Sequence, residues 1–180
     1  MREAGHLLNE LCDGATAFIR PGRKEYEIVA DIDRLARDKG AEDIRILAGE
    51  KRLNPPSFKQ SATLASHWAV YLAVQHERYW AEAGRTYILS GDAKFESAYQ
   101  KTRDIVSAMA KQLKPHGAVA AVDETARREL GEFYTPAAVY GLANGIGLNQ
   151  WEPPFLSDGE RGEVAAGRLA KSRFFAFGSE

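Results

Sequence analysis

Two charged side chains, Glu82 and Arg85, are the first candidates for chemistry in this chain. A glutamate in a cleft can take up and release a proton, and the planar guanidinium of an arginine can bind a carboxylate through two hydrogen bonds. His76 lies nearby in the sequence and could add a second acid–base group. The alternative is structural, with Arg85 and Glu82 forming an ion pair beside neighbouring strands. We favour the structural role.

The histidines give little support for a metal site. His67 and His76 are nine residues apart at the two ends of a predicted strand. We expect both on one face of that strand, too far apart along it to bind the same ion. His6 and His116 have no carboxylate or cysteine at ligand spacing. The chain also lacks a Gly-rich phosphate loop, a Cys-x-x-Cys pair and a nucleophile elbow. The sequence therefore predicts no bound metal and no cofactor.

A second informative segment, residues 144–154, has the sequence Asn-Gly-Ile-Gly-Leu-Asn-Gln-Trp-Glu-Pro-Pro. Its glycines are typical of close backbone approach and its prolines of a rigid turn. Asn144 offers a neutral amide, and Glu152 is interpreted as an exposed carboxylate in the turn. Trp151 is expected to pack on aromatic residues of the hairpin 68–87, which fills a pocket; the alternative is an apolar binding surface.

The predicted elements alternate helices with short strands. Apolar positions at helical spacing end at Pro21-Gly22, and a later helix ends at a similar Pro-x-Gly stop. Alternating apolar residues with a polar stop between them indicate a hairpin. In chain order the predictions are helix 4–18, helix 25–39, strand 44–47, strands 68–74 and 79–89 joined by the turn 75–78, helix 95–113, helix 118–130 and a strand with a tight turn in 144–154.

Four segments together resemble the pita-bread superfamily of methionine aminopeptidase, aminopeptidase P, prolidase and creatinase. They are Met-Arg-Glu-Ala-Gly with Ile-Arg-Pro-Gly at 1–22, Tyr-Trp-Ala-Glu-Ala-Gly-Arg-Thr at 79–86, Leu-Lys-Pro-His-Gly at 113–117, and the block 144–154. The resemblance is closest to aminopeptidase P and prolidase. It implies an α/β (α+β) pita-bread fold with two pseudo-symmetric halves, each of helices and an antiparallel sheet. We expect this domain over 1–157, then a divergent tail over 158–180 that ends before the last strands of the family would be complete.

The same resemblance locates where the metallopeptidases carry metal ligands. Their pattern Gly-Tyr-x-x-Asp-x-x-Arg-Thr puts a bridging aspartate where this chain has Glu82, and a partner aspartate where it has Tyr71. Their His-Gly-Ile-Gly-Leu … His-Glu-x-Pro segment puts a metal-binding histidine at Asn144 and a second, catalytic histidine at Trp151. A two-metal site needs several anionic or imidazole ligands. A tyrosine phenol, with an ordinary pKa of about 10, and an amide are poor substitutes.

We therefore predict a peptidase-family domain without its dinuclear metal ligands, acting as a non-catalytic binding or scaffold homologue, with peptidase activity not expected. Two alternatives stay open. One is a metal-independent hydrolase or lyase that uses Glu82, Arg85 and His76, although the creatinase-type histidine is missing from the loop 53–56. The other is an interaction module of a larger aminopeptidase-like protein. The residues at cleft positions would be Tyr71, His76, Asn144, Trp151 and Glu152.

Composition limits the partners. Of the 180 residues 44% are hydrophobic and 27% are charged, and the formal net charge is −1, so no basic field favours nucleic acid or a membrane surface. The single cysteine, Cys12, and the absence of a signal-peptide pattern at the N-terminus predict a cytoplasmic protein. We expect a small-molecule or peptide ligand, no nucleic acid, no membrane association, and we leave a homodimer open.

Overall fold

A computed structural model describes residues 1–50, 53–58, 62–114, 116–131, 143–156 and 170–172. The chain divides into two compact units, the first containing residues 1–98 and the second residues 99–174. None of the helices in the described part of the chain is long and apolar enough to cross a membrane.

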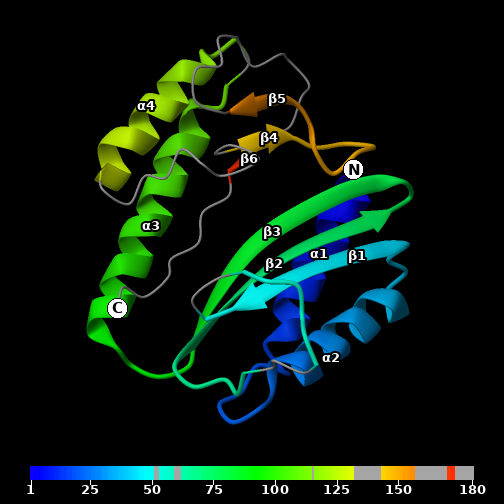
Figure 1. The fold of residues 1–180 in the computed structure, drawn as a ribbon. Helices are drawn as coiled ribbons and strands as arrows, with labels where there is room; N and C mark the ends of the chain where they lie inside the picture. Colours follow the sequence, from blue (N-terminus) through cyan, green and yellow to red (C-terminus); the bar gives the residue numbers. More distant parts are fainter. Residues whose placement is uncertain (51–52, 59–61, 115, 132–142, 157–169, 173–180) are drawn as a thin grey trace. The chain divides into compact units, whose positions relative to one another are not determined.

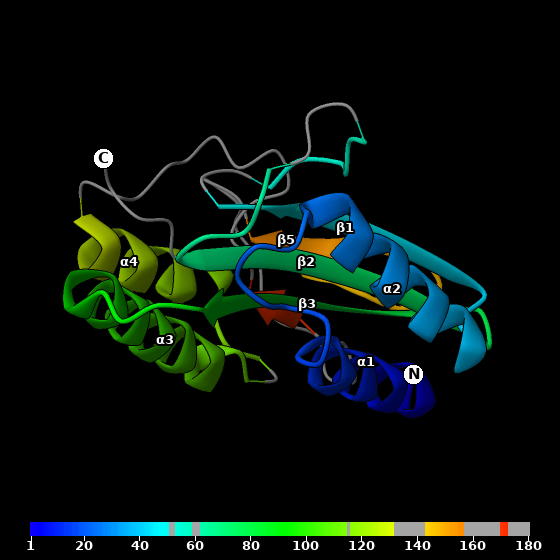
Figure 2. The ribbon, with the colours of Figure 1, turned by 90° about the horizontal axis from the view of Figure 1, so that it is seen from below.

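The first unit is a three-stranded antiparallel sheet with two helices on one face (Figures 1 and 2). The helices are α1 (Arg2–Ala15) and α2 (Glu25–Asp38), and the strands β1 (Asp43–Gly49), β2 (His67–His76) and β3 (Tyr79–Ile88) lie in the order β1-β2-β3. Helix α1 contacts β2 and β3, whereas α2 contacts β1 and α1. The predicted helices and hairpin of this half are thus confirmed.

The core lies between the helices and the sheet. Every second residue of β2 from Trp68 to Val74 belongs to it, together with the apolar stripe of each helix. The indole of Trp68 is fully buried and donates from Nε1 to Oε1 of Glu25, at 2.8 Å, at the start of α2. Burial of these apolar faces is the main stabilising term of the unit.

The hairpin turn is tighter than predicted. Glu77 and Arg78 form a two-residue loop in which both φ angles are positive, 49° and 69°, as a type I′ turn requires. His76 therefore pairs with Tyr79 as the last residue of β2. The expectation that His67 and His76 share a face is wrong, because an odd separation of nine residues places them on opposite faces of a strand.

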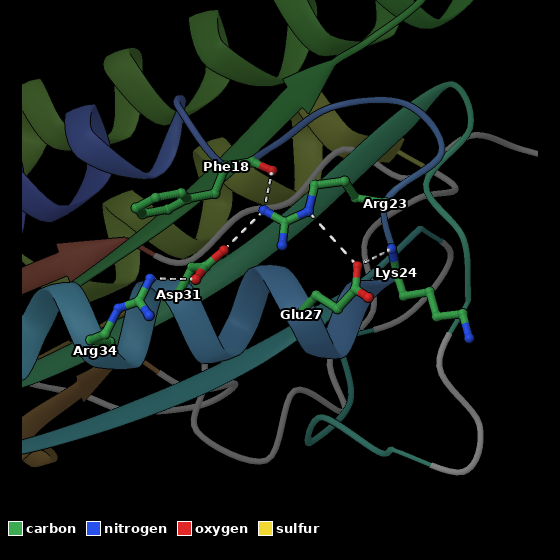
Figure 3. Close-up of polar contacts among 6 residues, drawn as sticks. All are labelled: Phe18, Arg23, Lys24, Glu27, Asp31 and Arg34. Atoms are coloured by element: carbon green, nitrogen blue, oxygen red, sulfur yellow. Dashed lines mark hydrogen bonds and ion pairs between the residues drawn. The ribbon is translucent and has the colours of Figure 1, made fainter.

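An arginine ties the segment after α1 to the surface of α2 (Figure 3). Arg23 donates from Nη1 to Oδ2 of Asp31 at 2.9 Å and to the carbonyl of Phe18 at 3.3 Å. Its Nε lies 3.8 Å from Oε2 of Glu27, and Arg34 pairs with Asp31 at 2.8 Å. These contacts are partly exposed, so their role is to fix the direction in which the chain enters α2.

The second unit combines helices with a small antiparallel sheet. Helix α3 (Ala93–Gln112) begins in the first unit, and α4 (Val119–Leu130) is bonded to it where Gln112 Nε2 donates to Oγ1 of Thr125 at 2.8 Å. The strands β4 (Ala143–Gly145), β5 (Glu152–Leu156) and β6 (Ala170–Ser172) have the order β5-β4-β6.

Two sequence-based expectations change in this unit. The two prolines at 153 and 154 lie in β5 and not in the turn, and β5 is an edge strand, where proline is tolerated. Strand β6 lies within the predicted tail 158–180, most of which is outside the described residues. The domain boundary at residue 157 stays a prediction.

Candidate functional site

The face of the first sheet that is turned away from α1 and α2 carries one group of candidate residues. The strand register puts Arg45, Ala73 and Glu82 in one row across the sheet. The next row contains Tyr71, which lies opposite Gly84. Since neighbouring rows on one face are two residues apart, Tyr71 and Glu82 are diagonal neighbours.

Tyr71 and Glu82 are bonded to each other. The phenol O–H of Tyr71 donates to Oε2 of Glu82. The side chains are deeply buried, with 5% of Tyr71 and 1% of Glu82 exposed. A buried carboxylate needs hydrogen-bond donors, and the phenol supplies one. The sequence placed these residues at the two aspartate positions of the metallopeptidases, and the structure brings them into contact.

Arg85 and His76 lie on the other face. Glu82 and Arg85 are three residues apart on one strand, so their side chains point to opposite sides of the sheet and the predicted ion pair between them is wrong. Arg85 is exposed and donates from Nη1 to the carbonyl of Gly84 at 3.1 Å. His76 Nδ1 donates to the carbonyl of Gly40, just after α2, at 3.0 Å. The proposed constellation of Glu82, Arg85 and His76 is therefore not assembled.

Two further polar residues lie on the Glu82 face: Arg45, which the sequence analysis missed, and His67, which it considered only as a metal ligand. Arg45 on β1 is exposed, and its Cζ lies 5.0 Å from the ring centroid of Trp80. His67 lies at the other end of the face, where its Nδ1 accepts from Oγ of Ser66 and its Nε2 donates to the carbonyl of Glu50, both at 3.0 Å. Arg45 is brought to this face by the pairing of β1 with β2. The sequence of so short a strand does not reveal that register.

The other group of candidate residues lies between β4 and β5 in the second unit. Asn144 is fully buried, and its Nδ2 donates to the carbonyls of Gly145 at 2.6 Å and of Gln150 at 3.3 Å. Because both partners only accept hydrogen bonds, the amide nitrogen must face them and Oδ1 must face away. Among the described residues no donor reaches this buried Oδ1.

The glycines of the block are explained by close approach, as predicted. A Cβ on Gly145 would lie 2.5 Å from the carbonyl oxygen of Pro153, and one on Gly147 would lie 2.8 Å from Oε2 of Glu152. Glu152 itself is half-buried, and its Oε1 accepts from the backbone N–H of Asn149 at 2.7 Å. The interpretation of Glu152 as an exposed turn residue is wrong, because its carboxylate closes the turn from the first position of β5.

Trp151 is half-buried at the end of this turn. Its predicted packing on the aromatic residues of the hairpin would join the two units and stays a prediction. Within the described ranges, no three histidine, cysteine, aspartate or glutamate side chains are grouped so that they could bind a metal ion.

The two helix-and-antiparallel-sheet units, with a glycine-framed β4–β5 turn, define the class of protein as a pita-bread domain, and comparison with known proteins agrees. The model of metallopeptidase family M24 matches residues 1–172, and the chain belongs to this family. No curated protein sequence matches the chain.

Solved structures of the same fold include prolidases and aminopeptidases. The prolidase from Pyrococcus horikoshii OT3 is similar with a TM-score of 0.79 at 21% identity, over 93% of this chain and 51% of that one. The X-Pro aminopeptidase from Thermotoga maritima MSB8 gives 0.77 at 18% identity, over 93% and 54%. The methionine aminopeptidase from Thermotoga maritima gives 0.78 at 14% identity, over 94% and 75%. The chain thus spans about half the length of the prolidase, and these identities establish the fold alone.

Proposed function

We propose that this chain is a prolidase-like domain that binds a short peptide and does not hydrolyse it by a two-metal route. The observation that carries the proposal is the hydrogen bond from Tyr71 to Glu82. The resembled metallopeptidases have a bridging aspartate at the position of Glu82 and a partner aspartate at that of Tyr71, whereas here the phenol of Tyr71 donates a hydrogen bond to the carboxylate of Glu82. A dication would have to displace that hydrogen before it could bind both oxygens.

Asn144, at the third position that the resemblance assigns to a metal ligand, also argues against a dinuclear metal site. Asn144 presents Oδ1, a single neutral oxygen, while its Nδ2 is bound to two carbonyls. Divalent metals of hydrolytic sites are held by carboxylates and neutral imidazoles, which activate a water between them. The described residues do not fit a dinuclear centre. The peptide ligand is suggested by the similar solved structures, one of which is an X-Pro aminopeptidase.

The rival reading, a metal-independent enzyme, is weakened because Arg85 and His76 lie on the face opposite Glu82. Glu82 is also deeply buried and accepts a hydrogen bond from Tyr71, so its carboxylate is poorly placed to exchange a proton with a substrate. We therefore expect binding without turnover.

The test combines metal analysis, binding and turnover on the protein purified without chelator. We expect less than stoichiometric zinc, manganese, cobalt or iron, a rise in thermal midpoint with Xaa-Pro dipeptides, and no hydrolysis with added manganese or cobalt. Stoichiometric metal that is lost in Glu82→Gln would overturn the proposal. So would hydrolysis that disappears in the folded Glu82→Gln variant but survives in Arg85→Gln, the control on the other face.

A further inference from the structure

We propose that Arg45 is the residue of this domain that binds the carboxylate of its ligand, in the place that the sequence analysis gave to Arg85. The assignment rests on the proposed function, since it names the part of a peptide that the Glu82 face of the sheet recognises. Arg45 and Glu82 stand in one row of this face with the small side chain of Ala73 between them. Strands β1, β2 and β3 lie side by side in this order (Figure 1).

The guanidinium of Arg45 is held over the ring of Trp80 and has no anionic partner among the described residues. Its Cζ lies 5.0 Å from the ring centroid of Trp80, which is 6% exposed and therefore a fixed platform. A cation–π contact of this kind holds the positive charge in place but provides no oxygen to accept the N–H hydrogens. The side chain of Arg45 is exposed, so those hydrogens can reach a ligand.

The arginines in and next to α2, unlike Arg45, donate to oxygen acceptors within the protein. Arg23 and Arg34 bind the carboxylate of Asp31, and Arg37 donates to the carbonyl of Glu42 at 2.7 Å. The acidic neighbour of Arg45 on β1, Asp43, lies 3.8 Å from Arg37 and accepts from the N–H of Ile44 at 2.8 Å. Asp43 is thus engaged by other groups, and Arg45 is left with no carboxylate partner among the described residues.

A carboxylate fits this group better than other anions of a peptide. Its two oxygens match the planar fork of the guanidinium, and a C-terminal carboxylate is the one anion that every unmodified peptide carries. Glu82 on the same face is already bonded to Tyr71.

The experiment compares Ala-Pro with its C-terminal amide, Ala-prolinamide, by calorimetric titration of the full chain. For the wild type we expect the acid to bind about ten- to a hundredfold more tightly than the amide, as the loss of a charge-assisted hydrogen-bond pair would give. Arg45→Gln should bind both equally. Arg85→Gln, the matched control on the opposite face, should keep the wild-type ratio.

The outcomes separate this assignment from the proposed function. Equal binding of acid and amide by the wild type, or an unchanged ratio in Arg45→Gln, would show that Arg45 is not the carboxylate-binding residue, although a peptide is bound. Failure of the wild type to bind either ligand would overturn the proposed function and the assignment together. Should Arg45→Gln not fold, Arg45→Lys keeps a cation near Trp80 but loses the planar fork, and an acid preference undiminished in that variant would also contradict the proposal.

Discussion

The pair Tyr71–Glu82 in the first unit and Asn144 in the second are the buried polar groups that the sequence analysis assigned to metal-ligand positions, and their hydrogen bonding differs. In the first unit the phenol of Tyr71 donates to the carboxylate of Glu82. In the second, the amide nitrogen has two acceptors and the amide oxygen has no donor among the described residues. The first unit thus contains a paired buried donor and acceptor, and the second contains a buried amide oxygen that no donor of the described residues reaches.

The two positions differ in free energy, because a buried polar group needs a hydrogen-bond partner to offset the loss of water. An unpaired buried acceptor costs about 1–3 kcal/mol, whereas a paired one contributes about 1 kcal/mol. Buried Oδ1 of Asn144 therefore carries a cost that the Tyr71–Glu82 pair avoids. It is tolerated because the nitrogen of the same amide fixes the turn that β4 and β5 share.

The largest effect should come from exchanging amide for carboxylate at Asn144. Asn144→Asp replaces a group that donates to two carbonyls by one that can only accept, and it buries an uncompensated charge. We expect the free energy of unfolding to fall by about 3–5 kcal/mol, measured by urea denaturation at pH 7. The reverse exchange, Glu82→Gln, is the matched control: its Oε1 can still accept from Tyr71, and we expect a loss of about 1 kcal/mol. Equal losses in the two variants would remove the contrast between the two positions.

The next effect concerns the frame that holds Asn144. In Gly145→Ala the new Cβ would lie 2.5 Å from the backbone oxygen of Pro153, so strands β4 and β5 must separate. We expect a loss of about 3 kcal/mol, seen as a lower thermal midpoint. Gly5→Ala is the control, because a Cβ at Gly5 in α1 meets nothing within 4 Å, and alanine there should stabilise by about 0.5–1 kcal/mol. An unchanged thermal midpoint in Gly145→Ala would show that the backbones of β4 and β5 do not approach each other this closely.

Much of this frame could be predicted from the sequence, but the polar partners could not. Helical spacing and the Pro-Gly stop gave α1 and α2 to within a few residues, and the glycines at 145 and 147 were correctly read as sites of close approach. These features depend on local chemistry. The predicted pairing of Glu82 with Arg85 failed because strand alternation, a local rule, was not applied to an odd separation.

Other features depend on register, which is not local. Nothing in the short segment 43–49 shows that Arg45 lies in line with Glu82, since that follows from the pairing of β1 with β2 and of β2 with β3. The bond between Tyr71 and Glu82 likewise required the tight turn at Glu77 and Arg78 to set the hairpin register. The resemblance to the family singled out Tyr71 and Glu82 in the sequence. It did not predict that their side chains form a hydrogen bond with each other.

A moderate effect is expected from removing the donor at the closed pair. Tyr71→Phe deletes only the hydroxyl, so the buried carboxylate of Glu82 loses one hydrogen bond while the packing of the ring is kept. We expect a loss of about 2 kcal/mol in urea denaturation. The double variant with Glu82→Gln should be less destabilised than the sum of the single changes, because the two groups act on one bond. Additive losses would show that the hydroxyl and the carboxylate are independent.

The smallest effect should come from the exposed network in Figure 3, which sets the scale for polar contacts outside the two buried positions. Arg23 is one-third exposed and bonds to Asp31 and to the carbonyl of Phe18, so Arg23→Gln should cost about 0.5–1 kcal/mol. Arg34, whose side chain is 69% exposed, contacts the same Asp31, and Arg34→Gln should change stability by less than about 0.5 kcal/mol. Both losses should shrink in 1 M salt, which screens exposed charges but not the buried Tyr71–Glu82 bond. If Arg23→Gln were as costly as Tyr71→Phe, burial would not be what distinguishes these hydrogen bonds.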